Sequence, residues 1–331
     1  MRPQMEQTEE HAGRSAFDAL VSIVVPTFNA ARFLRTTLDS LLAQTHRALE
    51  VIVVDDQSTD ETCAIVASYG NRIRLVRQAN AGVCSARNRG AAEAHGRFVC
   101  FCDHDDYWYP EKVAQQIAAF ARDPDLGVVY SRFIRWDEDR DGHFPAPTDV
   151  ERPQHGDRLD AEESGWIYHR LLLDCWVLTS SAMIRADVLR ECGVFDEALP
   201  YGEDWDLWLR ISRRYRFARL DTPLVLYRQH RVQGSRVIRD IDYRTRILEQ
   251  AVHRWGLASP DGRAISRRQF NATLSRYHVA YGLYRLTANQ VGRAWTSFYR
   301  GWRATPFDAR PIAYMLLSLF GWRPTWDSGC E

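Results

Sequence analysis

The chain has 331 residues, of which 45% are hydrophobic and 12% are aromatic, so it can bury the core of one large domain or of two smaller ones. Lys and Arg together number 43, as do Asp and Glu, and this balance argues against broad binding to nucleic acid. The seven cysteines are odd in number and form no CxxC pair, which argues against a disulfide framework or a zinc site and favours a reducing compartment.

Neither the first residues nor the longest apolar run has the pattern of a membrane-targeting segment. Residues 1–19 are polar, lack the apolar stretch of a secretory signal and are expected to form a disordered tail. The run from Ile312 to Trp322 is shorter than the ~20 residues of a membrane-spanning helix. These features predict a cytoplasmic protein.

The first third of the chain alternates short apolar runs with the stripes of amphipathic helices. The predicted strands are 21–25, 49–54, 73–76 and 97–102. The predicted helices cover 34–42 and 84–94, and two more begin near residues 58 and 110, the first with a capping box of Ser58 and Glu61. This alternation predicts an α/β fold with a mainly parallel, doubly wound sheet.

The remaining two thirds are less regular. A polar, Pro-rich stretch at 136–165 is expected to be a lid or a disordered loop, followed by an apolar segment at 166–175. A strand at 177–184, a helix at 204–215 and a strand at 224–227 would complete one domain over residues 20–234. Residues 235–331 are expected to form a helical C-terminal appendage.

Polar clusters follow three of the predicted strands, at the edge where open α/β sheets bind ligands. They are Pro26-Thr27-Phe28-Asn29, Asp55-Asp56-Gln57-Ser58-Thr59-Asp60 and Asp103-His104-Asp105-Asp106. Carboxylates crowded in this way repel one another unless a cation or hydrogen-bond donors relieve the repulsion. In the third cluster, one carboxylate can hold Mg²⁺ or Mn²⁺ while its neighbour binds ribose, or the cluster is only an Asp-rich turn before a helix.

The other polar motifs also leave two interpretations open. Asp55 and Asp56 either cap a helix or accept a hydrogen bond from a nucleobase. Arg87 lies on the predicted helix at 84–94 and either reaches a base or diphosphate or is an ordinary surface arginine. The carboxylates of Glu203-Asp204-Trp205-Asp206 either stabilise a helix N-terminus or include a general base of raised pKa. A lone His230 is more often structural than a ligand.

Taken together, these motifs resemble the family 2 glycosyltransferases, which are inverting enzymes with the GT-A fold. The matching segments are VSIVVPTFNA, EVIVVDDQSTDET, NAGVCSARNRG, GRFVCFCDHDDYWYPEKV, GVFDEALPYGEDWDLWLR and LVLYRQH. They occur in the order of the family and cover roughly Val21 to His230. Gln57 stands where such proteins often carry Gly or Asn.

The resemblance implies a role for each matching residue. The nucleotide-binding residues would be Pro26, Thr27, Asn29, Asp56, Ser58, Arg87 and Asp103. The metal ligands would be Asp105 and His230, holding Mn²⁺ or Mg²⁺. Asp204 would be the catalytic base on the acceptor hydroxyl, with Glu203 positioning the acceptor.

The resemblance also implies an activity and partners. The chain would transfer a sugar from a nucleotide-diphosphate donor, with a UDP-sugar ahead of dTDP- and GDP-sugars, to an acceptor hydroxyl in cell-surface glycan or polysaccharide biosynthesis. The acceptor would be a glycan, a lipid-linked saccharide or a protein, and residues 136–165 and 177–181 are expected to shape its choice. The alternative is a catalytically inactive subunit that binds a nucleotide sugar in a glycan-assembly complex. A dehydrogenase is disfavoured, since no G-x-G-x-x-G turn follows the first strand.

The C-terminal segment has aromatic residues at helical spacing, Tyr277, Tyr281 and Tyr284, together with many arginines. Packing on the catalytic domain, or on a second copy in a homo-oligomer, is the favoured interpretation. Peripheral contact with the inner face of the cell membrane is the alternative, because Arg and Trp suit a lipid headgroup boundary.

Overall fold

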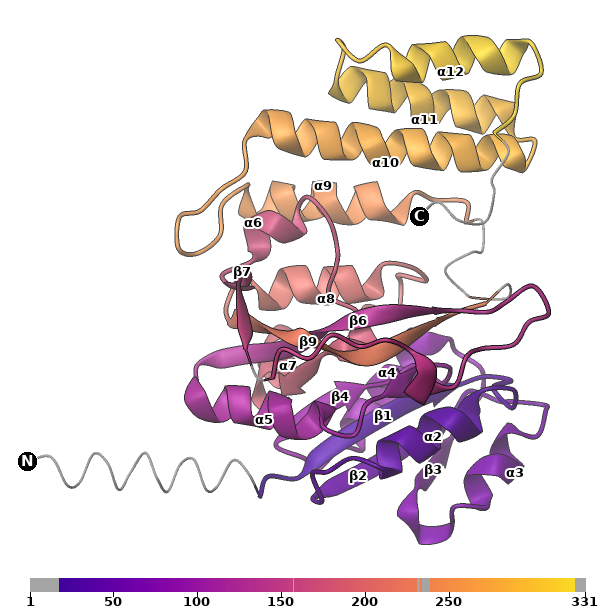
Figure 1. Cartoon of the computed structure of the whole chain (residues 1–331). Coiled ribbons are helices and arrows are strands. Elements are labelled where there is room, and N and C mark those ends of the chain that lie inside the picture. The colour runs from indigo at the N-terminus through magenta and orange to yellow at the C-terminus, as the bar shows by residue number, and fades with distance from the viewer. Residues whose placement is uncertain (1–17, 157, 231–232, 234–238, 325–331) are drawn as a thin grey trace, which may run out of the picture. The chain divides into compact units, whose positions relative to one another are not determined.

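The computed structural model describes residues 18–156, 158–230, 233 and 239–324 (Figure 1). The chain divides into two compact units. The first unit comprises the residues up to Ile167 together with Trp176–Val232, and the second comprises Tyr168–Cys175 and the residues from Gln233 onward. Residues 1–17 of the expected N-terminal tail lie outside the described residues.

The described residues of the first unit form a nine-stranded sheet. Its strands are β1 (Val21–Thr27), β2 (Leu49–Asp55), β3 (Arg74–Arg77), β4 (Phe98–Phe101), β5 (Tyr107–Trp108), β6 (Leu126–Asp137), β7 (Leu159–Gly165), β8 (Met183–Arg185) and β9 (Arg216–Gln229). Their order is β3-β2-β1-β4-β8-β6-β9-β5, and β7 pairs with β9 outside this path. The strands β3-β2-β1-β4 are parallel, β8 runs antiparallel to both β4 and β6, and β6 is parallel to β9. The expected α/β class is confirmed.

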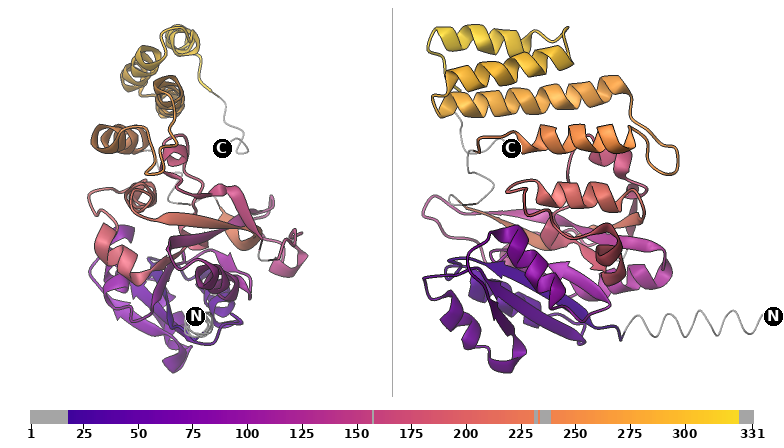
Figure 2. Two further views of the ribbon diagram at one scale, coloured as in Figure 1. Left: turned by 90° about the vertical axis from the view of Figure 1, so that its left-hand side faces the viewer. Right: turned by 180° about the vertical axis from the view of Figure 1, so that it is seen from behind.

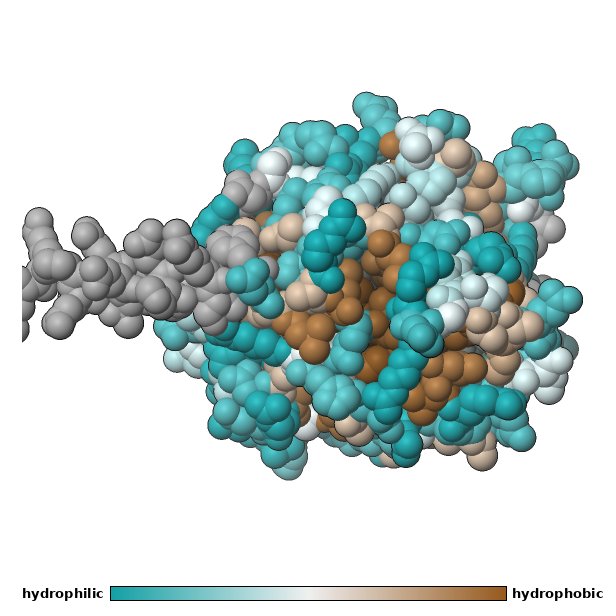
Figure 3. Space-filling model, turned by 90° about the horizontal axis from the view of Figure 1, so that it is seen from below, coloured by the Kyte–Doolittle hydropathy of each residue, from teal (hydrophilic) through white to brown (hydrophobic). Residues whose placement is uncertain are grey.

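Helices follow the strands of the first unit in the expected alternation. They are α2 (Leu34–Leu42), α3 (Thr62–Ala67), α4 (Val83–Ala92), α5 (Lys112–Arg122), α7 (Ala186–Cys192) and α8 (Glu203–Ile211). Every residue of β1 and of β4 is buried, which explains why the sequences of these strands are largely apolar. The face of the molecule seen from below shows hydrophobic residues gathered between hydrophilic side chains (Figure 3).

Two local expectations are corrected by the structure. The stretch at 136–165 is not one loop, because β6 extends to Asp137, a 3₁₀ turn covers Pro147–Asp149 and β7 covers Leu159–Gly165. Side chains of β7 are half-buried or exposed, so this strand pairs with β9 without an apolar pattern that the sequence could reveal. The predicted strand at 177–184 is a 3₁₀ turn, η3 (Thr179–Ser181), followed by the short β8.

The predicted capping box is also wrong. Helix α3 begins at Thr62, after both Ser58 and Glu61, and its N-terminal residue makes no side-chain cap. The Ser58 hydroxyl instead accepts a hydrogen bond from Asn29 N at 2.9 Å. Thr62 N donates to Oδ1 of Asp60 at 3.0 Å, so an aspartate two residues before the helix takes the place of the expected serine.

The second unit is helical in its described residues. Its helices are α6 (Tyr168–Leu171), α9 (Tyr243–Trp255), α10 (Arg267–Thr287), α11 (Val291–Ala304) and α12 (Arg310–Leu319), of which α10, α11 and α12 lie side by side (Figure 2). Ser266 caps α10 through a capping box with Gln269. Among the described residues, no helix combines the length and the apolar character that crossing a bilayer would require.

Candidate functional site

The loops after β1 and β2 hold each other through reciprocal hydrogen bonds. Asn29 N donates to the Ser58 hydroxyl at 2.9 Å, and Thr59 N donates to Oδ1 of Asn29, also at 2.9 Å. Ala31 N donates to Oδ2 of Asp60 at 3.0 Å. Two predicted nucleotide-binding residues, Asn29 and Ser58, therefore join neighbouring loops at the carboxyl edge of the parallel strands.

Both of these loops contain a non-glycine residue in the left-handed backbone region, Asn29 with φ 48° and Gln57 with φ 69°. Asn tolerates this conformation better than most residues, whereas Gln has no such advantage. The preference for Gly or Asn at the Gln57 position in the family that this chain resembles thus has a physical basis.

Pro26 and Thr27, which were expected to line a base pocket, are buried at the end of β1. The Thr27 hydroxyl donates to the carbonyl of Val54 in β2 at 3.2 Å, and Pro26 pairs with the same residue in the sheet register. Their side chains are therefore part of the buried structure at the edge of the sheet.

Asp56 follows β2, and its buried carboxylate closes the turn that leads into α4. Its Oδ1 accepts from Gln78 Nε2 at 2.8 Å and from Ala81 N at 2.9 Å, and its Oδ2 accepts from Gly82 N at 2.8 Å. Gly82 has φ 89°, which allows two successive amides to face one carboxylate. A carboxylate has about four acceptor positions, so one on Oδ2 is left for a ligand N–H.

Asp105 and His230 form a buried pair. His230 Nε2 lies 2.9 Å from Oδ2 of Asp105, and the two residues are 6% and 7% exposed. Burial acts to raise the pKa of Asp105, but the hydrogen bond from His230 and the nearby imidazoles hold it below the ordinary value. His230 appeared as a lone histidine in the sequence, and the fold brings it into contact with Asp105, 125 residues away in the chain.

The residues around this pair fix its position. Arg228 donates through Nε to the carbonyl of Asp105 at 2.6 Å and through its backbone N to Oδ1 of Asp106 at 3.1 Å. Its guanidinium lies 3.8 Å from the ring centroid of Trp136. Burial lowers the pKa of Arg228 to about 10 and raises the pKa of Asp106 well above its ordinary value. Arg228 lies in the same motif as His230, but its position beside His230 in the sequence does not indicate that its side chain bonds with Asp105.

Arg87 brings the two acidic motifs together. Its Nη2 donates to Oδ1 of Asp103 at 2.6 Å and its Nη1 donates to Oε1 of Glu203 at 2.7 Å. The guanidinium also lies 5.1 Å from the ring centroid of Phe195. Arg87 is 4% exposed, so the interpretation as an ordinary surface arginine is wrong. Its buried guanidinium bridges Asp103 and Glu203.

Asp204 lies beside this bridge in the first turn of α8, which starts after Gly202 in a left-handed conformation. Its Oδ1 accepts from Trp205 N at 2.7 Å, and Thr179 Oγ1 lies 3.4 Å from its Oδ2. Burial raises the pKa of Asp204 to about 7, helped by the charge of Glu203 and opposed by Arg87. A carboxyl with this pKa can take a proton near neutral pH.

The turn η3 lies within residues 177–181, which were expected to shape the choice of acceptor, and its contacts with the acidic motifs were not predicted. The buried Ser180 hydroxyl accepts from Asp103 N at 3.0 Å, and the preceding Thr179 contacts Asp204. One short turn therefore contacts both acidic motifs. The Thr-Ser-Ser triplet is the signal in the sequence for these contacts, although it lies within the segment predicted as a strand.

The chemistry of Asp105 and His230 fits a divalent cation. His230 Nδ1 is a buried atom with no hydrogen-bond partner among the described residues, so the ring is not committed to a second protein group. The carboxylate of Asp105 and the imidazole of His230 lie in contact, 2.9 Å apart at Oδ2 and Nε2, so both would be available to one cation. Asp139, Asp141 and His143 form another group of residues whose side chains could hold a metal ion, and all three are exposed.

Comparison with known proteins places these motifs in a family. Residues 22–175 match the family model described as glycosyl transferase family 2. This part of the chain belongs to that family. The membership expected from the motifs is therefore confirmed.

Relatives of the chain are also named as glycosyltransferases. An uncharacterized glycosyltransferase of Rickettsia prowazekii is 33% identical over 201 residues, which are 60% of this chain and 61% of the relative. Another, from Rickettsia bellii, is 35% identical over 227 residues, which are 68% of this chain and 32% of the relative. The chain thus spans less than two thirds of the length of these relatives.

Solved structures confirm the GT-A fold of this chain. Residues 1–349 of S. aureus TarS in complex with UDP-GlcNAc align with a TM-score of 0.61 at 20% identity, over 91% of this chain and 85% of that one. The mannosyltransferase PcManGT from Pyrobaculum calidifontis in complex with GDP-Man and Mn²⁺ aligns with a TM-score of 0.50 at 18% identity, over 97% of this chain and 91% of that one.

Proposed function

We propose that this chain is a metal-dependent, inverting glycosyltransferase that moves a sugar from a nucleotide-diphosphate donor to an acceptor hydroxyl. The observation that carries the proposal is the Arg87 bridge between Asp103 and Glu203. It sets a carboxylate at a strand end, where nucleotides bind in this kind of sheet, beside the acidic N-terminus of α8. Donor and acceptor groups must meet in such a place for direct transfer.

On the donor side, the interlocked loops after β1 and β2 would receive the nucleotide. Asp56 would accept a base N–H on the acceptor position that its own turn leaves open. Asp103 would bind the ribose hydroxyls, and Arg87 would keep its carboxylate oriented. The backbone and side chains of Asn29 and Ser58 would shape the wall of the base site.

Asp105 and His230 would hold Mn²⁺ or Mg²⁺. A bound cation of this kind neutralises negative charge on a departing diphosphate. Arg228 and Asp106 would keep the Asp105 loop in place through the contacts described above.

Asp204 would act as the base. Its carboxylate would take the proton of the acceptor hydroxyl while that oxygen attacks the anomeric carbon from the face opposite the diphosphate. The bond from the anomeric carbon to the diphosphate oxygen breaks as the new bond forms, so the configuration inverts. An α-linked donor would give a β-linked product. Glu203 would orient the acceptor and help to keep the pKa of Asp204 near neutral.

The proposed donor is a UDP-sugar. TarS, which shares the fold of this chain, is described with UDP-GlcNAc, whereas PcManGT is described with GDP-Man and Mn²⁺. The proposed acceptor is a glycan hydroxyl in polysaccharide or cell-surface glycan assembly, on a free or lipid-linked saccharide.

The deciding experiment measures thermal unfolding of the full chain with UDP, dTDP and GDP, each with and without Mn²⁺. Wild type is compared with Asp105→Ala. A ligand present at 100 times its dissociation constant adds about 2.7 kcal/mol to the free energy of unfolding, which is a readily measured shift. We expect UDP to stabilise the wild type only with Mn²⁺ and the variant to lose that response.

The same samples separate an enzyme from an inactive binding subunit. NMR of the product formed from a UDP-sugar and a panel of acceptor saccharides gives the anomeric configuration. A retained configuration would refute the Asp204 mechanism. Nucleotide binding without transfer to any acceptor would favour the binding subunit, and no nucleotide binding at all would overturn the donor site.

A further inference from the structure

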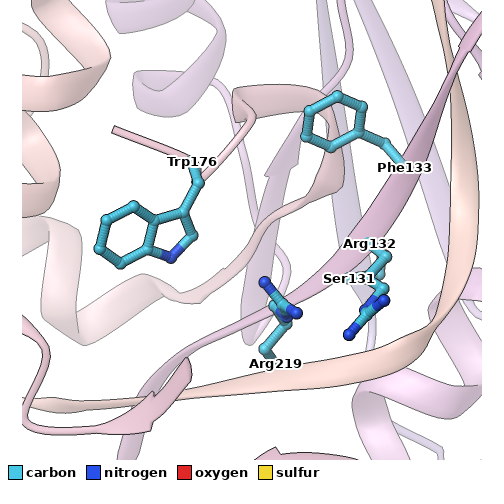
Figure 4. A pocket seen from close by; sticks show the side chains of 5 residues that line it. All are labelled: Ser131, Arg132, Phe133, Trp176 and Arg219. Atoms are coloured by element: carbon cyan, nitrogen blue, oxygen red, sulfur yellow. The ribbon is translucent and has the colours of Figure 1, made fainter. Parts of the chain in front are cut away.

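A pocket of about 240 Å³ lies in the first unit, outside the residues assigned to donor binding and catalysis. Its lining residues are Ser131, Arg132, Phe133, Trp176 and Arg219 (Figure 4). Three of these side chains come from β6 and one from β9, next to the place where register shifts interrupt the pairing of these strands around Ser131 and Arg132. Figure 4 shows the rings of Trp176 and Phe133 apart from each other, with the side chains of Arg219 and Arg132 lower in the view.

The arginines of this pocket are already paired with carboxylates. Arg132 Nε lies 2.8 Å from Oδ1 of Asp221, and Arg219 Nη2 donates to Oδ2 of Asp160 at 2.6 Å. Glu163 lies 4.0 Å from Arg219 as well. Since two guanidinium groups face three carboxylates, the pocket has no excess positive charge that would select an anionic ligand.

Trp176 is held in a fixed orientation. Its Nε1 donates to the Tyr130 hydroxyl at 3.2 Å, and that hydroxyl donates to the carbonyl of Glu163 in β7 at 2.7 Å. The Trp176 side chain is only half-buried, so part of its ring remains available to a ligand. A fixed aromatic ring beside polar, charge-balanced groups suits a ligand with an apolar face and hydroxyl edges.

Ser131 provides an independent observation. It is 1% exposed, and its Oγ is a buried atom with no hydrogen-bond partner among the described residues. A buried hydroxyl without a partner costs free energy, so its presence in the wall of a pocket indicates that a ligand completes its bonding.

The chain connects this pocket to the proposed base. Trp176 precedes Thr179 by three residues, which span at most about 11 Å, and the Thr179 hydroxyl lies 3.4 Å from Oδ2 of Asp204. Trp208 Nε1, also from α8, donates to the carbonyl of Val177 at 3.0 Å and ties the connecting segment to the helix that carries Asp204. The segment that carries Trp176 therefore leads directly to the helix that carries Asp204.

We propose that this pocket binds a neutral sugar ring of the acceptor glycan, at a distance from the hydroxyl that reacts. The ring packs against Trp176, and its hydroxyls bond with Ser131 and Arg219. This inference rests on the proposed transferase function, because only a glycan acceptor would need a second subsite along its length.

The test uses the full chain with UDP and Mn²⁺ on an array of neutral, uronate-bearing and phosphate-bearing oligosaccharides. The strongest neutral oligosaccharide is then titrated in solution against wild type, Trp176→Ala and Ser131→Ala. We expect Trp176→Ala to weaken binding about tenfold or more and Ser131→Ala about threefold. Trp322→Ala, an exposed tryptophan in the second unit, is the control and should bind as wild type does.

Ser131→Ala guards against a folding artefact. Because it removes a hydroxyl without a partner, its melting temperature should equal or exceed that of wild type, so weaker binding cannot come from unfolding. Unchanged affinity in both pocket variants would overturn the proposal. Capture of phosphate- or uronate-bearing glycans alone, or of no glycan by a wild type that binds UDP, would also overturn it.

Binding of UDP with Mn²⁺ is measured on the same samples. It distinguishes a failure of the proposed function from a failure of the acceptor subsite alone. If wild type binds neither UDP nor Mn²⁺, the proposed function fails, whatever the array shows. If nucleotide binding is intact in every variant and glycan binding does not respond to the pocket, the subsite alone fails.

Discussion

Arg87 and Glu203 are 116 residues apart in the chain, and their side chains meet at 2.7 Å. The same guanidinium holds Asp103, so one buried cation joins the end of β4 to the start of α8. The geometry of the proposed base therefore depends on a residue of the proposed donor side.

Arg87→Gln should lower the free energy of unfolding by about 3 kcal/mol, because it leaves two carboxylates in a largely buried site without their cation. Urea unfolding at pH 7 measures the change. Arg89→Gln is the matched control on the same helix, since Arg89 is 55% exposed and pairs only with Glu93 in the described contacts. Its effect should stay within about 0.5 kcal/mol. Equal stability of the two variants would show that the bridge is not stabilising.

Transfer activity should rise with pH through a midpoint near 7, because Asp204 must lose its proton to act as a base and its pKa is raised to about 7. Asp204→Asn should lose at least about a hundredfold in kcat. Glu203→Gln should move the midpoint downward, because the charge of Glu203 raises the pKa of Asp204. A pH–rate profile of kcat/KM checks this, and an unmoved midpoint in Glu203→Gln would contradict it.

The contribution of Asp204 to the free energy of unfolding should fall as pH rises from about 4 to about 7. The pKa of Asp204 is higher in the folded protein than the ordinary 3.8, so the folded state binds more protons than the unfolded state in that window. The stabilisation by Asp204 is complete below pH 3.8, the ordinary pKa, and is lost as pH rises through about 7, the pKa in the folded protein. Asp204→Asn should remove this contribution, on the order of a few kcal/mol. Urea unfolding at pH 5 and pH 8 compares the two proteins, and parallel pH dependence would count against the raised pKa.

His230→Gln should abolish most of the Mn²⁺-dependent stabilisation by UDP, with binding at least about tenfold weaker, because an amide can still reach Asp105 but offers no imidazole nitrogen. The matched variant is His143→Gln in the exposed group with Asp139 and Asp141, where the imidazole side chain is 80% exposed. It should respond to UDP and Mn²⁺ as wild type does. If His143→Gln lost the response to UDP and Mn²⁺ in thermal unfolding and His230→Gln kept it, the metal site would be the exposed group.

Gly90→Ala should destabilise the first unit by about 1–3 kcal/mol. A Cβ at Gly90 would overlap Cγ1 of Val24 and lie 3.1 Å from its Cγ2, and the valine is fully buried in β1. Gly292→Ala in α11 is the control, because its Cβ would meet no atom within 4 Å and the change should stabilise its helix by up to about 1 kcal/mol. Calorimetry distinguishes the two outcomes, and a stable Gly90→Ala would show that α4 can move away from the sheet.

The parallel half of the sheet follows closely from the sequence, since strands buried on both faces need unbroken apolar runs. The predictions at 21–25 and 49–54 lie within β1 and β2. By contrast, β7 has the sequence LDAEESG, and its place in the sheet comes from backbone pairing with β9, which leaves no hydrophobic pattern. The segment at 177–184 is apolar and buried, yet its hydroxyl-bearing triplet bonds with the acidic motifs and turns as a 3₁₀ helix.

The candidate site was predictable as a set of acidic clusters at strand ends. What joins them was not predictable, because Arg87 and Arg228 act across more than a hundred residues and have the same local pattern as exposed arginines. Asp105 and His230 were assigned to one metal through family resemblance, and the fold places them in contact. Their role as ligands stays a prediction.

The hydrogen bonds between the loops after β1 and β2 affect the enthalpy and entropy with which a nucleotide binds there. Asn29, Ser58 and Thr59 are bonded to one another without any ligand. A molecule that binds at this rim therefore finds backbone that is already ordered and loses little conformational freedom there. Calorimetric titration should then show a small entropic penalty for binding of the base moiety. In Asn29→Ala this entropic penalty should be larger, while the enthalpy of binding changes less.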